Sequence, residues 1–193
     1  MNFNEWFLKY YNNLGFGGRD QTMKKALELF IEKKGQIIVE TGTIHPDWGA
    51  GQSTLVFADF CKTFNHHLFT IDIDHQTLED AKTTTQPYRQ FVTYVENDSV
   101  SLLKGFNQKI DLLYLDSMDC DEYDSPESLE LIKSQIHQER EIKMAYDKLS
   151  DNAIVLLDDA NFYNGGKCRL SRQFLKEKGW KEIIKEKQSL WIR

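Results

Sequence analysis

The sequence has few of the features that mark a specialised class of protein. It contains only three cysteines, Cys61, Cys120 and Cys168, an odd number without the spacing of a metal site. We therefore expect free thiols in a reducing, cytoplasmic compartment. No apolar run is long enough to span a membrane, and the first 13 residues are too polar for a signal peptide.

The chain also lacks an excess of basic residues. It has 24 Lys and Arg against 30 Asp and Glu, which gives a formal net charge of −6. Proteins that bind nucleic acids or anionic membranes in general need a basic surface, so this balance argues against both classes. With 193 residues, of which 40% are hydrophobic, and with no repeat or linker, we expect one globular structural domain.

Apolar runs rich in β-branched residues alternate with helical patterns along the chain. We predict strands near residues 37–39, 68–71, 91–95, 110–115, 153–157, 180–186 and 189–193, and helices between the first six, including a long one over residues 129–149. This alternation predicts an α/β fold with a doubly wound, Rossmann-like, mostly parallel seven-stranded sheet. Because only a tight turn separates the last two strands, they should form an antiparallel C-terminal hairpin.

The N-terminal segment, residues 1–35, precedes the first strand and is predicted to be helical. Its aromatic residues have helical spacing: Phe3, Trp6, Phe7, Tyr10 and Tyr11. Such a helix either packs on the domain or closes over a pocket as a lid. We therefore divide the chain, within one structural domain, into a helical cap or lid, residues 1–35, and a Rossmann-like domain, residues 36–193.

The stretch Gln36 to Ser53 combines a short strand, an acid, a glycine loop and the start of a helix. Glycines let the backbone approach a ligand, and the N–H groups of the following helix point at it, which is how α/β proteins build nucleotide pockets. A plain strand-to-helix turn is the alternative. The tight G-x-G-x-x-G turn is absent, which disfavours a dinucleotide-dependent oxidoreductase. The candidate pocket residues are Glu40, Gly42, Gly49, Gly51 and Ser53.

An acidic residue follows nearly every predicted parallel strand: Glu40, Asp72, Asp98, Asp116, Asp158 and Asp159. Carboxylates at one edge of a sheet repel each other unless hydroxyls or cations neutralise them. The acid after the second strand is placed to accept both hydroxyls of a ribose. The last three follow neighbouring strands and together offer the hard oxygen ligands that Mg²⁺ or Ca²⁺ prefers. For any single acid, a helix cap or a solvated loop is the alternative.

One candidate proton acceptor lies on the predicted long helix. His137 and Glu141 are four residues apart and therefore share one helix face. If this face looks into the pocket, His137 is the natural base, since its unperturbed pKa is near neutrality. The alternative is an ordinary surface pair.

Five segments in order, VETG…GAGQS, TIDID, ENDS, DLLYLD and IVLLDD, together with the closing hairpin, resemble the class I S-adenosylmethionine-dependent methyltransferases. The resemblance covers residues 36–193. It implies that Gly42, Gly49 and Gly51, with Glu40 and Ser53 beside them, hold the methionine part of the cofactor. It also implies that Asp72 binds the ribose, and that Asp98 and Ser99 border the adenine.

The acids after the fourth and fifth strands resemble the Mg²⁺ site of small-molecule O-methyltransferases of the catechol and macrolide-sugar types. The resemblance implies that Asp116, Asp158 and Asp159 hold a divalent metal, most simply Mg²⁺, with Asp116 also in the catalytic group. The lysine that acts as base after the fourth strand in catechol-type enzymes is absent, and Asp119 stands there. A bound metal would lower the pKa of a substrate hydroxyl and fix its direction.

The sequence thus predicts a metal-assisted, S-adenosylmethionine-dependent O-methyltransferase that acts on a small hydroxylated acceptor. We expect no nucleic-acid or membrane partner, and a homodimer stays open. A metal-independent methyltransferase acting on a carboxylate or an amine is one alternative. The other is a catalytically silent module that binds S-adenosylmethionine or S-adenosylhomocysteine.

Overall fold

The computed structural model describes residues 1–11, 18–44, 52–120, 125 and 127–193, and its central feature is one seven-stranded sheet. The strand order is β3-β2-β1-β4-β5-β7-β6. The first five strands pair in parallel, and β7 is antiparallel to both β5 and β6. The predicted doubly wound α/β sheet with an antiparallel C-terminal hairpin is therefore confirmed. The strands are β1 (Ile37–Thr41), β2 (His67–Asp72), β3 (Val92–Glu96), β4 (Ile110–Leu115), β5 (Leu149–Leu157), β6 (Lys181–Lys185) and β7 (Ser189–Ile192).

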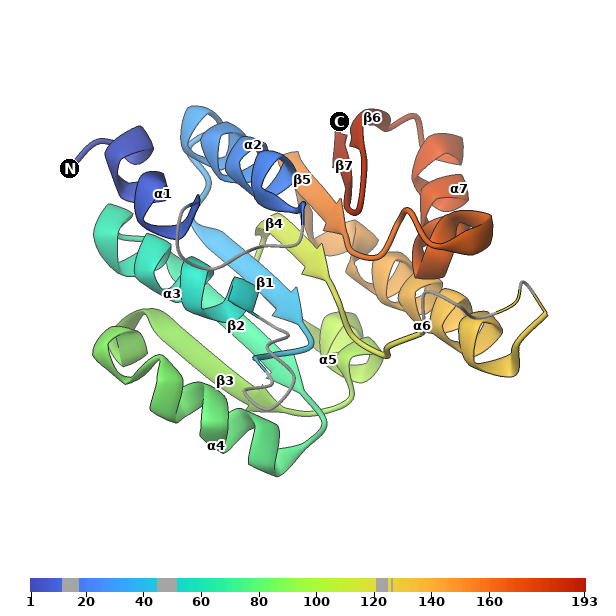
Figure 1. Cartoon of the computed structure of the whole chain (residues 1–193), viewed down its shortest axis with the longest axis horizontal. Coiled ribbons are helices and arrows are strands. Elements are labelled where there is room, and N and C mark those ends of the chain that lie inside the picture. The colour runs from blue at the N-terminus through green and yellow to red at the C-terminus, as the bar shows by residue number, and fades with distance from the viewer. Residues whose placement is uncertain (12–17, 45–51, 121–124, 126) are drawn as a thin grey trace.

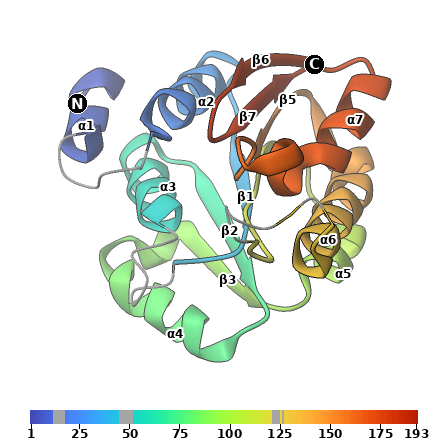
Figure 2. The same ribbon diagram turned by 45° about the vertical axis from the view of Figure 1, so that its right-hand side comes forward.

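Helices cover both faces of this sheet. They are α1 (Phe3–Tyr11), α2 (Asp20–Glu32), α3 (Gln52–Phe64), α4 (His75–Thr84), α5 (Ser99–Gly105), α6 (Leu129–Ala145) and α7 (Arg169–Glu177). Figure 1 shows α1, α2 and α3 gathered on one side, while α5, α6 and α7 lie across the sheet, an arrangement that is also visible in the turned view of Figure 2. None of the helices in the described ranges is long and apolar enough to cross a membrane.

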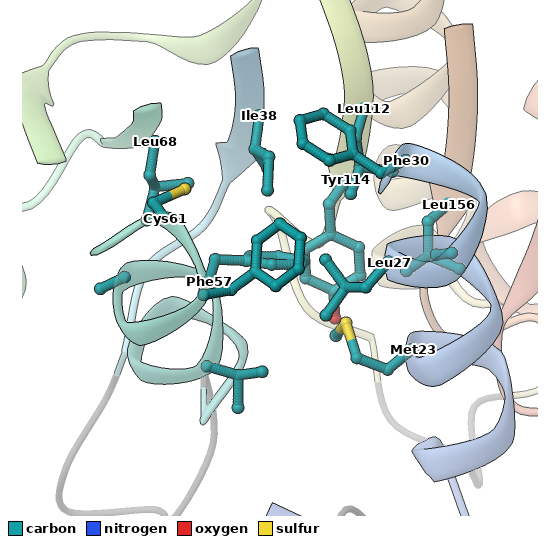
Figure 3. Close-up of a cluster of buried hydrophobic side chains, with 14 of the residues drawn as sticks. Met23, Leu27, Phe30, Ile38, Phe57, Cys61, Leu68, Leu112, Tyr114 and Leu156 are labelled. Atoms are coloured by element: carbon teal, nitrogen blue, oxygen red, sulfur yellow. The ribbon is translucent and has the colours of Figure 1, made fainter. Parts of the chain in front are cut away.

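Two hydrophobic cores lie on the two faces because successive side chains of a strand point to opposite sides. Ile38 of β1 belongs to the core under α1, α2 and α3, whereas the next residue, Val39, belongs to the core under α5, α6 and α7. Figure 3 shows the first core, where side chains of α2 and α3 pack over the strands. One of its members is Tyr114 of β4, whose hydroxyl group reaches the edge of the sheet at which the strands end.

The predicted long helix over residues 129–149 is too long at its C-terminal end. Helix α6 ends at Ala145, a 3₁₀ turn covers Tyr146–Lys148, and β5 begins at Leu149, four residues before the predicted start of the strand. Leu149 is buried and pairs with Ile110 at the start of β4. Leu149 fits the apolar face of a helix but is the first paired residue of β5. Its state is set by pairing with a distant strand, which periodicity cannot show.

Helix α1 packs against α3 through its aromatic face. Trp6, Phe7 and Tyr10 are buried in the core that α2 and α3 also share. The indole Nε1 of Trp6 donates a hydrogen bond to Asp59 Oδ2 at 2.9 Å, and the hydroxyl group of Tyr10 donates to the same oxygen. The described part of the N-terminal segment is thus joined to the sheet domain by packing and by buried hydrogen bonds. Whether it also acts as a lid stays a prediction.

Candidate functional site

A pocket of about 540 Å³ lies at the carboxyl ends of the parallel strands. Its described wall comes from the segments that follow β1, β2, β3 and β4, and from one face of α6. The strand order reverses between β1 and β4, and open α/β sheets bind their ligands in the crevice at such a point. The lining residues are Gly42, Thr43, Ile71–Asp74, Thr77, Asn97–Ser99, Asp116–Asp119 and His137.

Gly42 lets the end of β1 lie directly against the loop after β4. Its φ is +79°, and a Cβ atom at this position would stand 2.5 Å from the carbonyl oxygen of Asp116. Its N–H donates to the carbonyl oxygen of Ile71 at 2.9 Å. Both the backbone conformation and the close approach therefore require glycine. The other predicted glycines of this loop, Gly49 and Gly51, lie outside the described residues.

Glu40 of β1 is fully buried and links three elements, β1, β2 and α3. Its Oε1 accepts from the hydroxyl of Ser53 on α3 at 2.6 Å, and its Oε2 accepts from the hydroxyl of Thr70 on β2 at 2.9 Å. Burial raises the pKa of Glu40 to about 8, although the two hydroxyl groups oppose this shift. Glu40 and Ser53 thus tie the end of β1 to α3 and β2, and neither is among the described pocket-lining residues.

Asp72, at the end of β2, lies in the pocket wall with its carboxylate held in place by backbone groups. Oδ2 accepts from the N–H of Thr43 at 3.1 Å, and Oδ1 accepts from the N–H of Asp74 at 2.9 Å. These contacts leave further lone pairs for a ligand, because a carboxylate has about four acceptor sites.

Asp98 and Ser99, after β3, also line the pocket. Asp98 caps α5 by accepting from the N–H of Ser101 at 2.8 Å, and this bonding to Ser101 lowers the pKa of Asp98. The hydroxyl of Ser99 lies 3.1 Å from Nε2 of His137. Asp98 is therefore both a helix cap and a residue of the pocket wall.

The face of α6 that carries His137 looks into the pocket. His137 Nε2 lies 3.5 Å from Oε1 of the buried Glu141, which accepts from the hydroxyl of Ser117 at 2.6 Å. The interaction with Glu141 raises the pKa of His137 against the effect of burial, so the imidazole keeps its proton to higher pH than usual. The position suits a residue that faces a ligand, and the role of proton acceptor stays a prediction.

Asp116, Asp158 and Asp159 converge at the ends of β4 and β5. One carboxylate oxygen from each lies within 4.8 Å of the others. The single hydroxyl proton of Tyr114 is shared between Asp158 and Asp116 Oδ2, which lies 3.0 Å from the hydroxyl oxygen, and the amide of Gln188 donates to Asp158 Oδ2 at 2.9 Å. Of the three acids, Asp116 lines the pocket described above.

Two cationic side chains lie against these three carboxylates, and the sequence analysis missed both. Nζ of Lys167 is 2.8 Å from Asp116 Oδ1 and 3.1 Å from Asp159 Oδ2, and this side chain is fully buried. Arg19 places Nε 2.7 Å from Asp158 Oδ1 and a terminal guanidinium nitrogen 2.8 Å from Asp159 Oδ1. The sequence did indicate that cations were needed, because three carboxylates close together repel each other, but it did not indicate which residues supply them.

The local backbone explains how Lys167 reaches the acids. Gly166 precedes it with a φ of +55°, and a Cβ atom there would stand 1.7 Å from the carbonyl oxygen of Asp159. Asp159 also has a positive φ, of 55°, which is unusual for a residue other than glycine. The turn after β5 therefore folds back closely on the strand end, and this brings the lysine under the carboxylates.

Burial and charge act on the acids in different directions. Burial raises the pKa of Asp116 to about 7, although Lys167 opposes the shift. Burial would also raise the pKa of Asp158, but the charges of Arg19 and Lys167 hold it below its usual value. Burial raises the pKa of Asp159 despite both cations.

Three aspartates are suitable ligands for a divalent metal, but their carboxylates already have other partners. Each of the six carboxylate oxygens of Asp116, Asp158 and Asp159 has a hydrogen-bond or ion-pair partner. The partners are Lys167 and Tyr114 for Asp116, Arg19, Tyr114 and Gln188 for Asp158, and Arg19 and Lys167 for Asp159. A divalent ion bound by these oxygens would stand against a buried ammonium group and a guanidinium group, and the repulsion between the positive charges opposes it, so the residues as arranged do not fit one.

Comparison with known proteins agrees with this geometry. A family model described as a methyltransferase domain matches residues 39–160, so the chain belongs to that family. The resemblance to class I S-adenosylmethionine-dependent methyltransferases is thereby confirmed. No curated protein matches the chain significantly.

Solved structures show the same fold at low sequence identity. The S-adenosylhomocysteine-bound Podospora anserina methyltransferase PaMTH1 has a TM-score of 0.64 at 14% identity, covering 99% of this chain and 86% of its own. The O-methyltransferase NovP has a TM-score of 0.65 at 12% identity, covering 90% and 78%. Spermidine synthase from Thermotoga maritima has a TM-score of 0.59 at 13% identity, covering 89% and 58%. Because enzymes with different acceptors share the fold, the fold alone does not identify the acceptor.

Proposed function

We propose that this protein transfers the methyl group of S-adenosylmethionine to a hydroxyl group of a small molecule. The observation that carries the proposal is the pocket at the carboxyl ends of β1 to β4. Asp72, the acid proposed to bind the ribose, lies in one part of the pocket wall. Asp116, which clusters with Asp158 and Asp159, lies in another part.

In this proposal the cofactor lies across the ends of β1, β2 and β3. Asp72 accepts hydrogen bonds from the ribose hydroxyls, while Asp98 and Ser99 border the adenine. Gly42 gives the methionine part close access to the backbone, and for Gly49 and Gly51, outside the described residues, the same role rests on the sequence resemblance alone. Glu40 and Ser53 act indirectly, by fixing the end of β1 to α3 and β2.

The acceptor would lie beside Asp116 and within reach of His137. Methyl transfer is an in-line displacement at a sulfonium, so the enzyme must hold the attacking oxygen in one direction. The Asp116 carboxylate is itself held by Lys167 and Tyr114 and retains acceptor capacity toward a substrate hydroxyl. NovP, which is named as an O-methyltransferase, supports a hydroxyl acceptor, and the net charge of −6 argues against a nucleic acid.

The metal assistance implied by the family resemblance is not part of the proposed reaction. Mg²⁺ would supply a Lewis acid for the substrate hydroxyl, but at these carboxylates it would stand against the positive charges of Lys167 and Arg19. We therefore assign the orientation of the acceptor to the fixed Asp116 carboxylate and the uptake of its hydroxyl proton to the neutral form of His137, while the methyl group passes to the oxygen and S-adenosylhomocysteine leaves as the thioether.

The test is a calorimetric titration with S-adenosylhomocysteine, first with Mg²⁺ and then with a chelator, followed by a methyl-transfer assay. The assay uses labelled S-adenosylmethionine and a panel of catechols, sugars, amines and carboxylic acids. We expect binding under both conditions and transfer to hydroxylated acceptors only. Absence of binding would remove the methyltransferase function. Binding without transfer across the panel would indicate a silent binding module, and transfer to amines or carboxylates alone would overturn the hydroxyl assignment.

A further inference from the structure

We infer that Lys167 and Arg19 replace the divalent cation at the ends of β4 and β5, so that this acidic cluster does not bind a metal. When all three carboxyl groups are ionised they carry three negative charges, and the two side chains supply two positive charges at contact distance. Lys167 bridges Asp116 and Asp159 in the way that a metal ion would bridge two ligands. Arg19 bridges Asp158 and Asp159 with its planar fork, a geometry that suits carboxylates.

The ammonium group of Lys167 cannot leave this position easily, because the backbone on both sides of it is held. The carbonyl oxygen of Gly166 accepts from the side-chain amide of Gln135 on α6 at 2.9 Å. The thiol of Cys168 donates to the carbonyl oxygen of Asp158 at 2.6 Å. Displacing the ammonium would require a new place for a fully buried cationic side chain or a rearrangement of this turn.

The charge balance also opposes a metal while both cations are present. A divalent ion among the three carboxylates would stand within a few ångströms of two unit positive charges. Repulsion at such distances is strong in a buried site. The cluster therefore accepts either the two protein cations or a metal ion, but not both.

Lys167 is consequently a positioning residue for the proposed reaction. It contacts Asp116, which lines the pocket, while its own side chain is buried behind that carboxylate. This part of the inference rests on the proposed function. The statement about metal binding does not, because it concerns only the bonding of the cluster.

The experiment is a calorimetric titration of the whole chain with Mn²⁺, a paramagnetic substitute for Mg²⁺ that electron paramagnetic resonance can also count. We expect no saturable binding by the wild-type protein and no change of its melting temperature with Mg²⁺ or with a chelator. In Lys167→Met, which keeps the length of the side chain and removes its charge, we expect one bound Mn²⁺. Its affinity should be at least about tenfold above any residual binding by the wild type. Mn²⁺ should also recover part of the melting temperature that the variant loses.

The matched control is Lys82→Met, which removes an exposed lysine paired with Glu79 on α4 and should bind no Mn²⁺. If Lys167→Met does not fold, Lys167→Gln, which retains hydrogen-bond donors, takes its place. Saturable Mn²⁺ binding by the wild type overturns the inference whatever the variants do. A folded variant without gain of Mn²⁺ binding overturns it as well. Titration of the same samples with S-adenosylhomocysteine keeps the two proposals distinct, since loss of that binding affects only the proposed function.

Discussion

At the scale of single residues, Gly42 is a pocket position where the backbone leaves little room for a side chain. Replacing it with alanine puts a side chain at a φ of +79° and a Cβ atom 2.5 Å from a backbone oxygen. We predict that Gly42→Ala lowers the free energy of unfolding by at least about 2 kcal/mol, as measured by urea denaturation. The control is Gly105→Ala, at a glycine where nothing lies within 4 Å of the added Cβ, and it should be neutral or slightly stabilising.

Asp72 is the residue whose charge should matter most for the cofactor. We predict that Asp72→Asn weakens the binding of S-adenosylhomocysteine by about tenfold or more, because charge-assisted hydrogen bonds to the ribose contribute roughly 1.5–3 kcal/mol each. Asparagine retains one carbonyl acceptor and so keeps one of the two backbone N–H bonds of Asp72, which should lower the melting temperature only modestly. Calorimetry measures the affinity, and Asp80→Asn on α4 serves as the control. Unchanged affinity would contradict the ribose assignment.

At the scale of elements, α1 is joined to α3 by its aromatic face. Trp6 is fully buried there, whereas Leu8 on the same helix is 57% exposed. We predict that Trp6→Ala costs about 3–5 kcal/mol of stability and that Leu8→Ala costs little, both measured by chemical denaturation. If α1 were only a lid that rests on the domain, Trp6→Ala would instead leave stability nearly unchanged.

The joint between β1, β2 and α3 at Glu40 should make stability depend on pH. Burial raises the pKa of Glu40 from 4.5 to about 8, so the folded state holds a proton that the unfolded chain releases. The stabilisation that this group contributes is fully present below pH 4.5 and is lost as the pH rises to about 8.

Glu40→Gln cannot titrate at this position, so we predict that its stability relative to the wild type increases between pH 4.5 and 8. The slope of the difference should be at most about 1.4 kcal/mol per pH unit. Denaturation at a series of pH values measures it. A difference that does not vary with pH would contradict a protonated, buried Glu40.

At the scale of the whole molecule, the proposed cofactor should stabilise the fold by linkage. The pocket draws its wall from the ends of four strands and from α6, so it exists only when the sheet is assembled. We predict that S-adenosylhomocysteine at about a hundred times its Kd adds about 2.7 kcal/mol to the free energy of unfolding. Thermal or urea denaturation with and without the ligand measures this gain. Asp72→Asn at the same ligand concentration should gain clearly less.

The positions of the pocket-lining acids could be predicted from the sequence. Asp72, Asp98 and Asp116 end parallel strands, and parallel strands end at one edge of a sheet, so their meeting follows from strand order alone. The end of α6 could not be predicted in this way. Leu149 fits a helical stripe and a strand equally well, and only its pairing with Ile110 selects the strand.

The sequence by itself determined the order of the elements, the doubly wound sheet, and the gathering of Asp116, Asp158 and Asp159, because periodicity and strand direction are local properties. Only the tertiary structure decided what neutralises these acids. Arg19 is separated from Asp158 by 139 positions, and Lys167 from Asp116 by 51. These contacts form only when Arg19, just before α2, and Lys167, in the turn after β5, pack against the ends of β4 and β5. The local sequence showed that positive charge was needed, and the assembled fold supplied it from the protein's own side chains.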